Sequence, residues 1–176
     1  MEKIIETRRL ILREVGEVDQ EGLFDLDRRP EVHQYIGTIP LTDVDQALDS
    51  IRRLQKQYKE NGIGRWAVID KLSQEFLGWS GLKLWIDPLN NRKNIYELGY
   101  RFIPKYWGKG YATESAQAWA NYAFEVLKLS SIDGSRVCHE HHRIYLQRIE
   151  VPFVDVVTDR QGLVVQVSDL VSHCQG

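Results

Sequence analysis

Hydrophobic residues recur at helical spacing in two long stretches of the chain. The first stretch follows Thr42, which we expect to cap the helix, and it closes at Asn61-Gly62, a pair typical of a helix C-terminus. One face of each of the two helices is therefore expected to be buried. The apolar positions are Val44, Leu48, Ile51, Leu54 and Tyr58 in the first helix, and Ala116, Trp119, Ala120, Ala123, Phe124 and Leu127 in the second.

Stretches with an extended hydrophobic pattern lie before, between and after these helices. Gly99 falls inside one of them, which predicts a β-bulge or a close approach of another group to the backbone at that point. The predicted strands are residues 8–15, 65–70, 76–85, 95–103 and 131–137.

The remaining elements are shorter. Asp19 is the expected N-cap of a short helix that Pro30 should stop. In the last third of the chain we expect a short helix over 143–149 and a hairpin of 151–158 with 163–171. This order of elements predicts an α+β fold, with a mixed, mainly antiparallel sheet flanked by helices. Helices come first, a strand meander follows, and a strand, a loop, a helix and a further strand come last.

Composition narrows the class of protein. The chain has 176 residues with 43 % hydrophobic and 27 % charged residues, which suits one globular domain over 1–176. A net charge of -2 argues against a protein that binds nucleic acid by neutralising phosphates. There is no apolar run of the roughly 20 residues that a membrane span needs, and no secretory signal pattern at the start. With only two cysteines, we expect a cytoplasmic protein.

A loop with two glycines carries the strongest chemical signal. Gly108 and Gly110 open a helix directly after a strand, so backbone N–H groups and the helix dipole can hold a phosphate there, with Lys105 and Lys109 at the rim. A nucleoside-triphosphate loop would need Ser or Thr after the lysine, and a dinucleotide loop would need a third glycine where Thr113 stands. A coenzyme A pyrophosphate loop, or a tight turn without a ligand, remains.

Residues 96–115, YELGYRFIPKYWGKGYATES, resemble the central motif of the GNAT acetyltransferase superfamily, and in particular its RimJ/RimL-like branch. The family signature is Gln/Arg-x-x-Gly-x-Gly/Ala. Residues 105–110 read KYWGKG, with Lys in the first place. Residues 7–13, TRRLILR, are similar to the opening strand of the family, and the resemblance extends over about 7–132.

The resemblance implies transfer of an acetyl group from acetyl-coenzyme A (acetyl-CoA) to an amine in a ternary complex. It also implies that a backbone N–H near Phe102 or Ile103 polarises the thioester carbonyl. By the same resemblance, Tyr100, Arg101, Phe102 and Ile103 would bind the pantetheine arm, and Trp107, Gly108, Lys109, Gly110, Tyr111, Ala112 and Thr113 would surround the pyrophosphate.

The acceptor amine needs a proton acceptor, because alkyl amines have a pKa near ~10. Glu97 stands where RimJ/RimL-like enzymes often have a carboxylate, so it is the candidate base, with a surface carboxylate paired to Arg or Lys as the alternative. Tyr145 is the candidate acid, with a tyrosine packed on a helix as the alternative. Tyr35 and Trp79 are candidate acceptor-binding residues, and Trp79 could equally belong to the core.

The tail over 135–176 departs from the family pattern. The family places Asn-x-x-Ser and Gly-Phe on a helix after its fifth strand, and residues 139–151 contain neither. A diverged helix, a rebuilt C-terminal unit and a reading-frame slip are three open explanations. The histidines here do not form His-Glu-x-x-His, because Arg143 occupies the last position, so we predict no metal centre. A weak site at Cys138, His139 and His141 is the alternative.

Three classes of function remain open at this point. The first is an N-acetyltransferase acting on a protein N-terminus or a small amine, as a monomer or homodimer. The second is a coenzyme A-binding module that has lost catalysis, which the divergent tail motivates. The third is an interaction domain that binds no cofactor.

Overall fold

A computed structural model describes residues 3–33, 39–86, 93–138 and 143–150 of the chain. Within these residues, seven strands form one sheet and lie side by side in chain order. Neighbouring strands are antiparallel except β5 and β6, which run parallel. The expected α+β class with a mixed, mainly antiparallel sheet is confirmed. The strands are β1 (Ile4–Glu6), β2 (Leu10–Glu14), β3 (Arg65–Asp70), β4 (Phe76–Trp85), β5 (Ile95–Phe102), β6 (Ser131–Cys138) and β7 (Arg143–Glu150).

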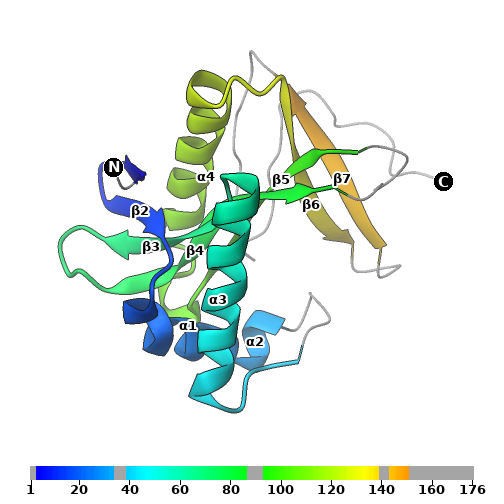
Figure 1. Cartoon of the computed structure of the whole chain (residues 1–176). Coiled ribbons are helices and arrows are strands. Elements are labelled where there is room, and N and C mark those ends of the chain that lie inside the picture. The colour runs from blue at the N-terminus through cyan, green and yellow to red at the C-terminus, as the bar shows by residue number, and fades with distance from the viewer. Residues whose placement is uncertain (1–2, 34–38, 87–92, 139–142, 151–176) are drawn as a thin grey trace.

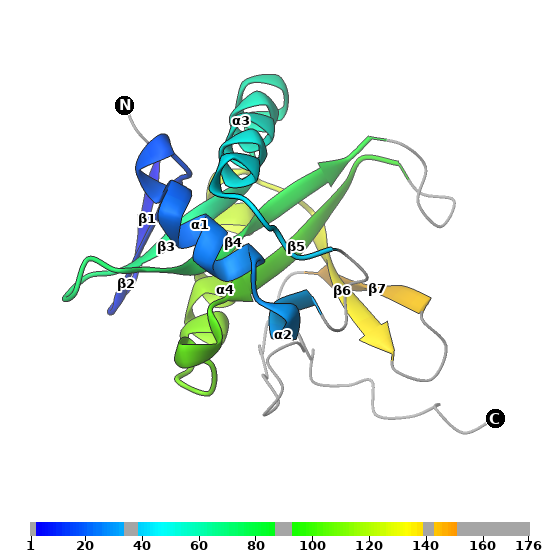
Figure 2. The same ribbon diagram turned by 90° about the horizontal axis from the view of Figure 1, so that it is seen from below.

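Helices cover both faces of this sheet. Figures 1 and 2 show α3 on one face and α4 on the opposite face. α1 packs against α3 and β4, whereas α4 packs against β2, β4 and β5. The helices are η1 (Glu17–Asp19), α1 (Gln20–Asp27), α2 (Pro30–His33), α3 (Val44–Asn61), η2 (Pro104–Tyr106), α4 (Tyr111–Asn121) and the π-helical turn η3 (Tyr122–Val126).

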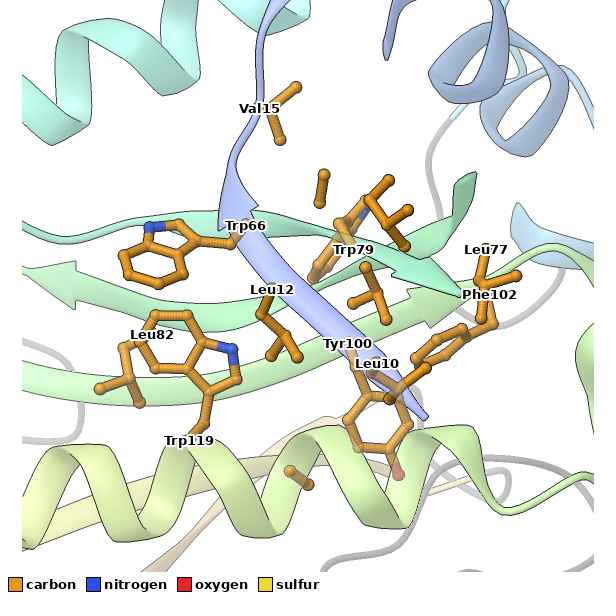
Figure 3. Packing of buried hydrophobic residues seen from close by; sticks show 14 of the residues in the cluster. Leu10, Leu12, Val15, Trp66, Leu77, Trp79, Leu82, Tyr100, Phe102 and Trp119 are labelled. Atoms are coloured by element: carbon orange, nitrogen blue, oxygen red, sulfur yellow. The ribbon is translucent and has the colours of Figure 1, made fainter. Parts of the chain in front are cut away.

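The core between the sheet and α4 is built around two tryptophans. Trp66 from β3 and Trp119 from α4 are fully buried, and their rings meet edge to face with centroids 4.7 Å apart. Figure 3 shows Leu12 and Leu82 beside this pair, between the strands and the helix. Aromatic pairs of this geometry add about 0.5–1.5 kcal/mol to the effect of area burial. This packing fixes α4, and with it the glycine loop that precedes the helix.

Sequence periodicity placed both long helices correctly, with an error of one residue at the N-terminus of α3. α3 begins one residue later than expected, because Asp43 rather than Thr42 accepts a hydrogen bond from the backbone of Asp45, at 2.8 Å. It ends at Gly62 with a φ of 68°, as expected. Asp19 is the N-cap residue of α1, as expected, but its carboxylate makes no capping hydrogen bond to that helix.

Instead, the Asp19 carboxylate accepts two hydrogen bonds from Arg13, at 2.7 and 2.8 Å, and one from the backbone N–H of Gly16. Pro30 does more than stop α1, because it is the first residue of α2. A proline fits that position since the first N–H of a helix has no intrahelical acceptor.

Two expectations about β structure are wrong. The bulge expected at Gly99 is absent, because Gly99 lies opposite Gly81 in a regular register, and the irregularity in the sheet falls instead between Val68 and Ile69 of β3. The alternative expected at Gly99 agrees with the structure, since side-chain atoms of Trp79 and Arg65 lie 3.7 and 3.8 Å from where a Cβ would be. Residues 143–150 form β7 rather than a helix, since they pair with β6 along its length. The expected hairpin over 151–171 and the histidines of 139–142 lie outside the described residues. No helix in the described part of the chain is long and apolar enough to cross a membrane.

Candidate active site

The sheet opens between β5 and β6. These strands are paired at Glu97 with Asp133 and at Leu98 with Gly134, and the described residues that follow on both strands form no further pairs. Figure 2 shows the two strands diverging from this point. The second half of β5 therefore has one edge turned toward the gap, where a linear ligand could hydrogen-bond as an added strand.

The hydrogen-bond pattern decides which backbone groups face that gap. The N–H of Ile103 donates to the carbonyl of Leu77 at 3.0 Å, so it points toward β4. Because backbone direction alternates along a strand, the N–H groups of Tyr100 and Phe102 point the other way, toward the gap. The carbonyl of Phe102 accepts a hydrogen bond from Trp107 Nε1 at 2.7 Å. Of the two residues expected to polarise the thioester, only Phe102 has its N–H on the side of the gap.

The glycine loop connects this strand edge to α4. Gly108 and Gly110 have φ values of 72° and 78°, a left-handed conformation that other residues adopt only with strain. Gly110 is the N-cap of α4, and the first intrahelical bond runs from the N–H of Glu114 to its carbonyl, at 3.1 Å. The N–H groups of Tyr111 and Ala112 precede that bond, so they lie at the positive end of the helix dipole. This is the arrangement that an anionic pyrophosphate requires.

Arg9, next to β2, holds the loop in place, a role that sequence reasoning missed. Its Nη1 donates to the carbonyl of Lys109 at 3.0 Å, its Nε donates to Glu114 at 2.6 Å, and its guanidinium lies 4.4 Å from the ring centroid of Tyr111. Glu114 also accepts hydrogen bonds from the Thr7 hydroxyl and the Arg9 N–H. Burial alone would raise the pKa of Glu114, but these hydrogen bonds outweigh burial and lower it.

Glu97 lies on the opposite face of the sheet from α4. Its side chain is only 9 % exposed and accepts a hydrogen bond from Trp85 Nε1 at 2.8 Å. An Nη2–Oε2 distance of 3.9 Å separates it from Arg65. The alternative of a surface carboxylate paired to an arginine is wrong only about the surface. Glu97 is buried beside the point where β5 and β6 separate, and Arg65 is its arginine partner.

Trp79 is buried on the same face, between two arginines. The guanidinium carbons of Arg65 and Arg101 lie 4.5 and 5.1 Å from its ring centroid. Nη1 of Arg101 in turn donates to Asp27 at the end of α1, at 2.6 Å, and His33 Nε2 lies 2.7 Å from the Asp27 carbonyl. A cavity of about 190 Å³ opens here between α1, α3 and the sheet. Tyr35 falls outside the described residues.

Spacing along β5 separates two of the expected roles. Glu97 and Phe102 are five residues apart, so about 16 Å of strand lies between them at roughly 3.3 Å per residue. One amine cannot be held at both places. The register puts Tyr100 between them, about 10 Å from Glu97 on the same scale.

Tyr145, the expected acid, lies on β7 opposite Arg136 of β6. Arg136 is two residues beyond Gly134, as Tyr100 is two residues beyond Leu98. Tyr145 is therefore one strand past the gap, at the same level along the sheet as Tyr100. The expected helix is absent, and the role of Tyr145 stays a prediction.

Comparison with known proteins agrees with this geometry. Residues 9–144 match the family model of the acetyltransferase (GNAT) domain. An uncharacterized N-acetyltransferase p20 of Bacillus licheniformis is 35 % identical over 128 residues, which cover 73 % of this chain and 70 % of the relative.

Solved structures share the fold. A GNAT-family acetyltransferase from Bacillus anthracis superposes with a TM-score of 0.64 at 25 % identity, over 78 % of this chain and 76 % of that one. A spermidine N-acetyltransferase from Vibrio cholerae, solved with CoA and spermine, gives a TM-score of 0.59 at 21 % identity over 74 % and 73 %.

The family match covers most of the chain, including the opening strand, the strand edge along the gap and the glycine loop. GNAT acetyltransferases use acetyl-CoA, and among the three open classes of function this favours the enzyme. The chain belongs to the GNAT acetyltransferase domain family and is an acetyltransferase.

Proposed function

We propose that this enzyme transfers the acetyl group of acetyl-CoA directly to a primary amine within a ternary complex. One observation carries the proposal: a buried carboxylate, Glu97, sits on β5 at the point where the sheet opens toward the cofactor side. The cavity beside Trp79 lies on the opposite side of the sheet from α4. Two reactants can therefore approach β5 from different directions. The Vibrio cholerae relative, named for spermidine, also acts on an amine.

The cofactor would lie along the gap between β5 and β6. Its pyrophosphate would accept hydrogen bonds from the backbone of residues 108–112, and Lys109 would add positive charge at the rim. The N–H of Phe102 would bind the pantetheine arm. The thioester carbonyl would then lie nearer the level of Tyr100, because a carbonyl at Phe102 would be too far from Glu97. This position differs from the one that the resemblance alone implied.

The chemical step requires a neutral amine. Glu97 would accept the ammonium proton through a chain of water molecules, since about 10 Å of strand separates it from Tyr100 and one water bridges only about 6 Å. The amine nitrogen would then form a bond to the carbonyl carbon, the carbon–sulfur bond would break to release the thiolate, and the nitrogen would lose its second proton to solvent, from which the proton donor of the thiolate is restored. Tyr145 is the proposed donor of a proton to that thiolate.

The variant Glu97→Gln tests this role. It keeps the size of the side chain and an oxygen for the Trp85 hydrogen bond, but it removes the proton acceptor. We expect kcat to fall by about 10²–10⁴-fold at neutral pH while the Kd of acetyl-CoA stays unchanged. Glu60→Gln, an exposed carboxylate on α3, is the matched control. A pH–rate profile of Glu97→Gln that overlays the wild-type profile would remove Glu97 from the mechanism.

A further inference from the structure

The cavity beside Trp79 carries an excess of positive charge. Three arginines line it, namely Arg53, Arg65 and Arg101, against one carboxylate, Asp27. Glu97 is near but does not line it. The other lining residues are Leu23, Ser50, Leu54, Gln57 and Trp79. A cavity of this kind favours a ligand with a negative charge.

Two of the arginines already have partners. Arg101 donates to Asp27 at 2.6 Å, so one charge offsets the other. Arg53 is exposed at the edge of the cavity and donates to the Ser50 hydroxyl at 2.8 Å. Neither arginine requires a ligand for its hydrogen bonding.

Arg65 is different. Its Nε is buried, and no group in the described part of the chain accepts a hydrogen bond from it. The nearest carboxylate oxygen, on Glu97, is 3.9 Å from Nη2, which is beyond hydrogen-bond distance. Burial lowers the pKa of Arg65, and the nearby carboxylates of Glu97 and Asp27 offset that effect only in part. Because 30 % of the Arg65 side chain is still exposed, a ligand in the cavity can reach the guanidinium, and a carboxylate is the anion that fits its planar donor edge.

We propose that Arg65 binds a carboxylate of the acceptor, so that the acceptor is an amino acid rather than a polyamine. This inference rests on the proposed amine acetylation. The guanidinium of Arg65 lies over Gly99, next to Tyr100, where the thioester carbonyl would lie. The carboxylate and the amine of the acceptor must therefore lie a few ångströms apart, as they do in α- and β-amino acids. The indole of Trp79, stacked on the same guanidinium, holds the donor edge in a fixed plane.

The test uses matched pairs of acceptors. Acetylation of each protein L-amino acid and of β-alanine is measured beside the amine that remains when the carboxylate is removed. For the best pair, we expect the wild-type kcat/KM to be at least tenfold higher for the amino acid. In Arg65→Gln this ratio should fall to about one, whereas Arg52→Gln, an exposed arginine on α3, should keep it. The ratio cancels any effect of the substitution on Glu97.

Three outcomes would overturn the proposal. These are a wild-type preference for the amines, a ratio that Arg65→Gln does not change, and faster acetylation of O-phosphoethanolamine than of any amino acid. Arg65→Lys, which keeps the charge but not the planar donor edge, should show an intermediate ratio if Arg65→Gln does not fold.

Direct binding separates this proposal from the proposed function. Calorimetry measures the binding of the amino acids to the wild type and to Arg65→Gln, each saturated with CoA. One result would be that no acceptor is acetylated, that an amino acid nevertheless binds, and that Arg65→Gln abolishes this binding. That result would support the carboxylate site and refute the transfer reaction. If the amines are acetylated and no amino acid binds, the result would support the transfer reaction and refute the carboxylate site.

Discussion

Gly108 and Gly62 form a natural pair for testing the cofactor loop. Both have a left-handed backbone, with φ values of 72° and 68°, and a Cβ at either position would meet no atom within 4 Å. Substitution by alanine should therefore lower the free energy of unfolding by a similar amount at both positions, roughly 1 kcal/mol. Only Gly108 lies in the expected phosphate cradle, because Gly62 ends α3.

We expect Gly108→Ala to weaken acetyl-CoA binding at least tenfold and Gly62→Ala to leave it unchanged, as measured by calorimetry. The added methyl group would strain the loop and crowd the pyrophosphate. Equal cofactor affinities in the two variants would exclude this loop from the binding site, whatever their stabilities.

Single residues were predictable from sequence only where their chemistry is local. The two loop glycines were identified by their spacing, because a left-handed turn before a helix requires glycines at fixed positions close together in the sequence. Arg9, Asp27 and Arg65 were missed, because each acts through a contact with a residue distant in the chain. No periodicity in the sequence predicts that Trp79 packs against Arg65 and that Nε of Arg65 is buried.

At the scale of elements, Glu114 joins the first turn of α4 to the segment before β2 through Thr7 and Arg9. Its folded-state pKa is lowered, so its contribution to stability is present above the ordinary glutamate pKa of 4.5 and is lost as the pH falls through the folded value. We expect Glu114→Gln to reduce the free energy of unfolding by about 1–2 kcal/mol at pH 7.

That reduction should shrink as the pH falls below about 4.5, because protonation then removes the same charge from the wild type. Urea denaturation at several pH values measures the difference. Glu125→Gln, an exposed carboxylate in η3, is the control. A difference that is constant with pH would show that the charge of Glu114 is not the source of its effect.

Elements with a sustained pattern were predicted well. The expected strands 65–70 and 76–85 coincide with β3 and β4, and the helix before Gly62 ends where expected. The short segment 143–150 was misassigned, because its strand form depends on pairing with β6 and not on its own periodicity. The irregularity between β3 and β4 lies beside Gly78, which has a φ of 155°. Glycine spacing alone did not separate this position from Gly81 and Gly99, which lie in regular register.

For the whole molecule, acetyl-CoA should act as a stabilising ligand. At one hundred times its Kd, a ligand that binds only the folded state adds about 2.7 kcal/mol, which in a chain of this size corresponds to roughly 5–10 °C in Tm. NADH, which also carries a pyrophosphate, should cause no shift. Thermal melts with each compound check this, and equal shifts would mean that the loop binds pyrophosphates without selecting coenzyme A.

The order of strands in the sheet also affects which changes in the sequence the fold can tolerate during evolution. Each strand from β1 to β7 pairs with its neighbours in the chain, so the last strands touch the rest of the sheet only along one edge. A recombination, an insertion or a shifted reading frame after β6 would therefore alter the last edge of the sheet and leave every earlier pairing intact. The glycine loop and α4 precede that edge. The loop that we propose to bind the cofactor is thus encoded before the part of the gene that such a change would alter.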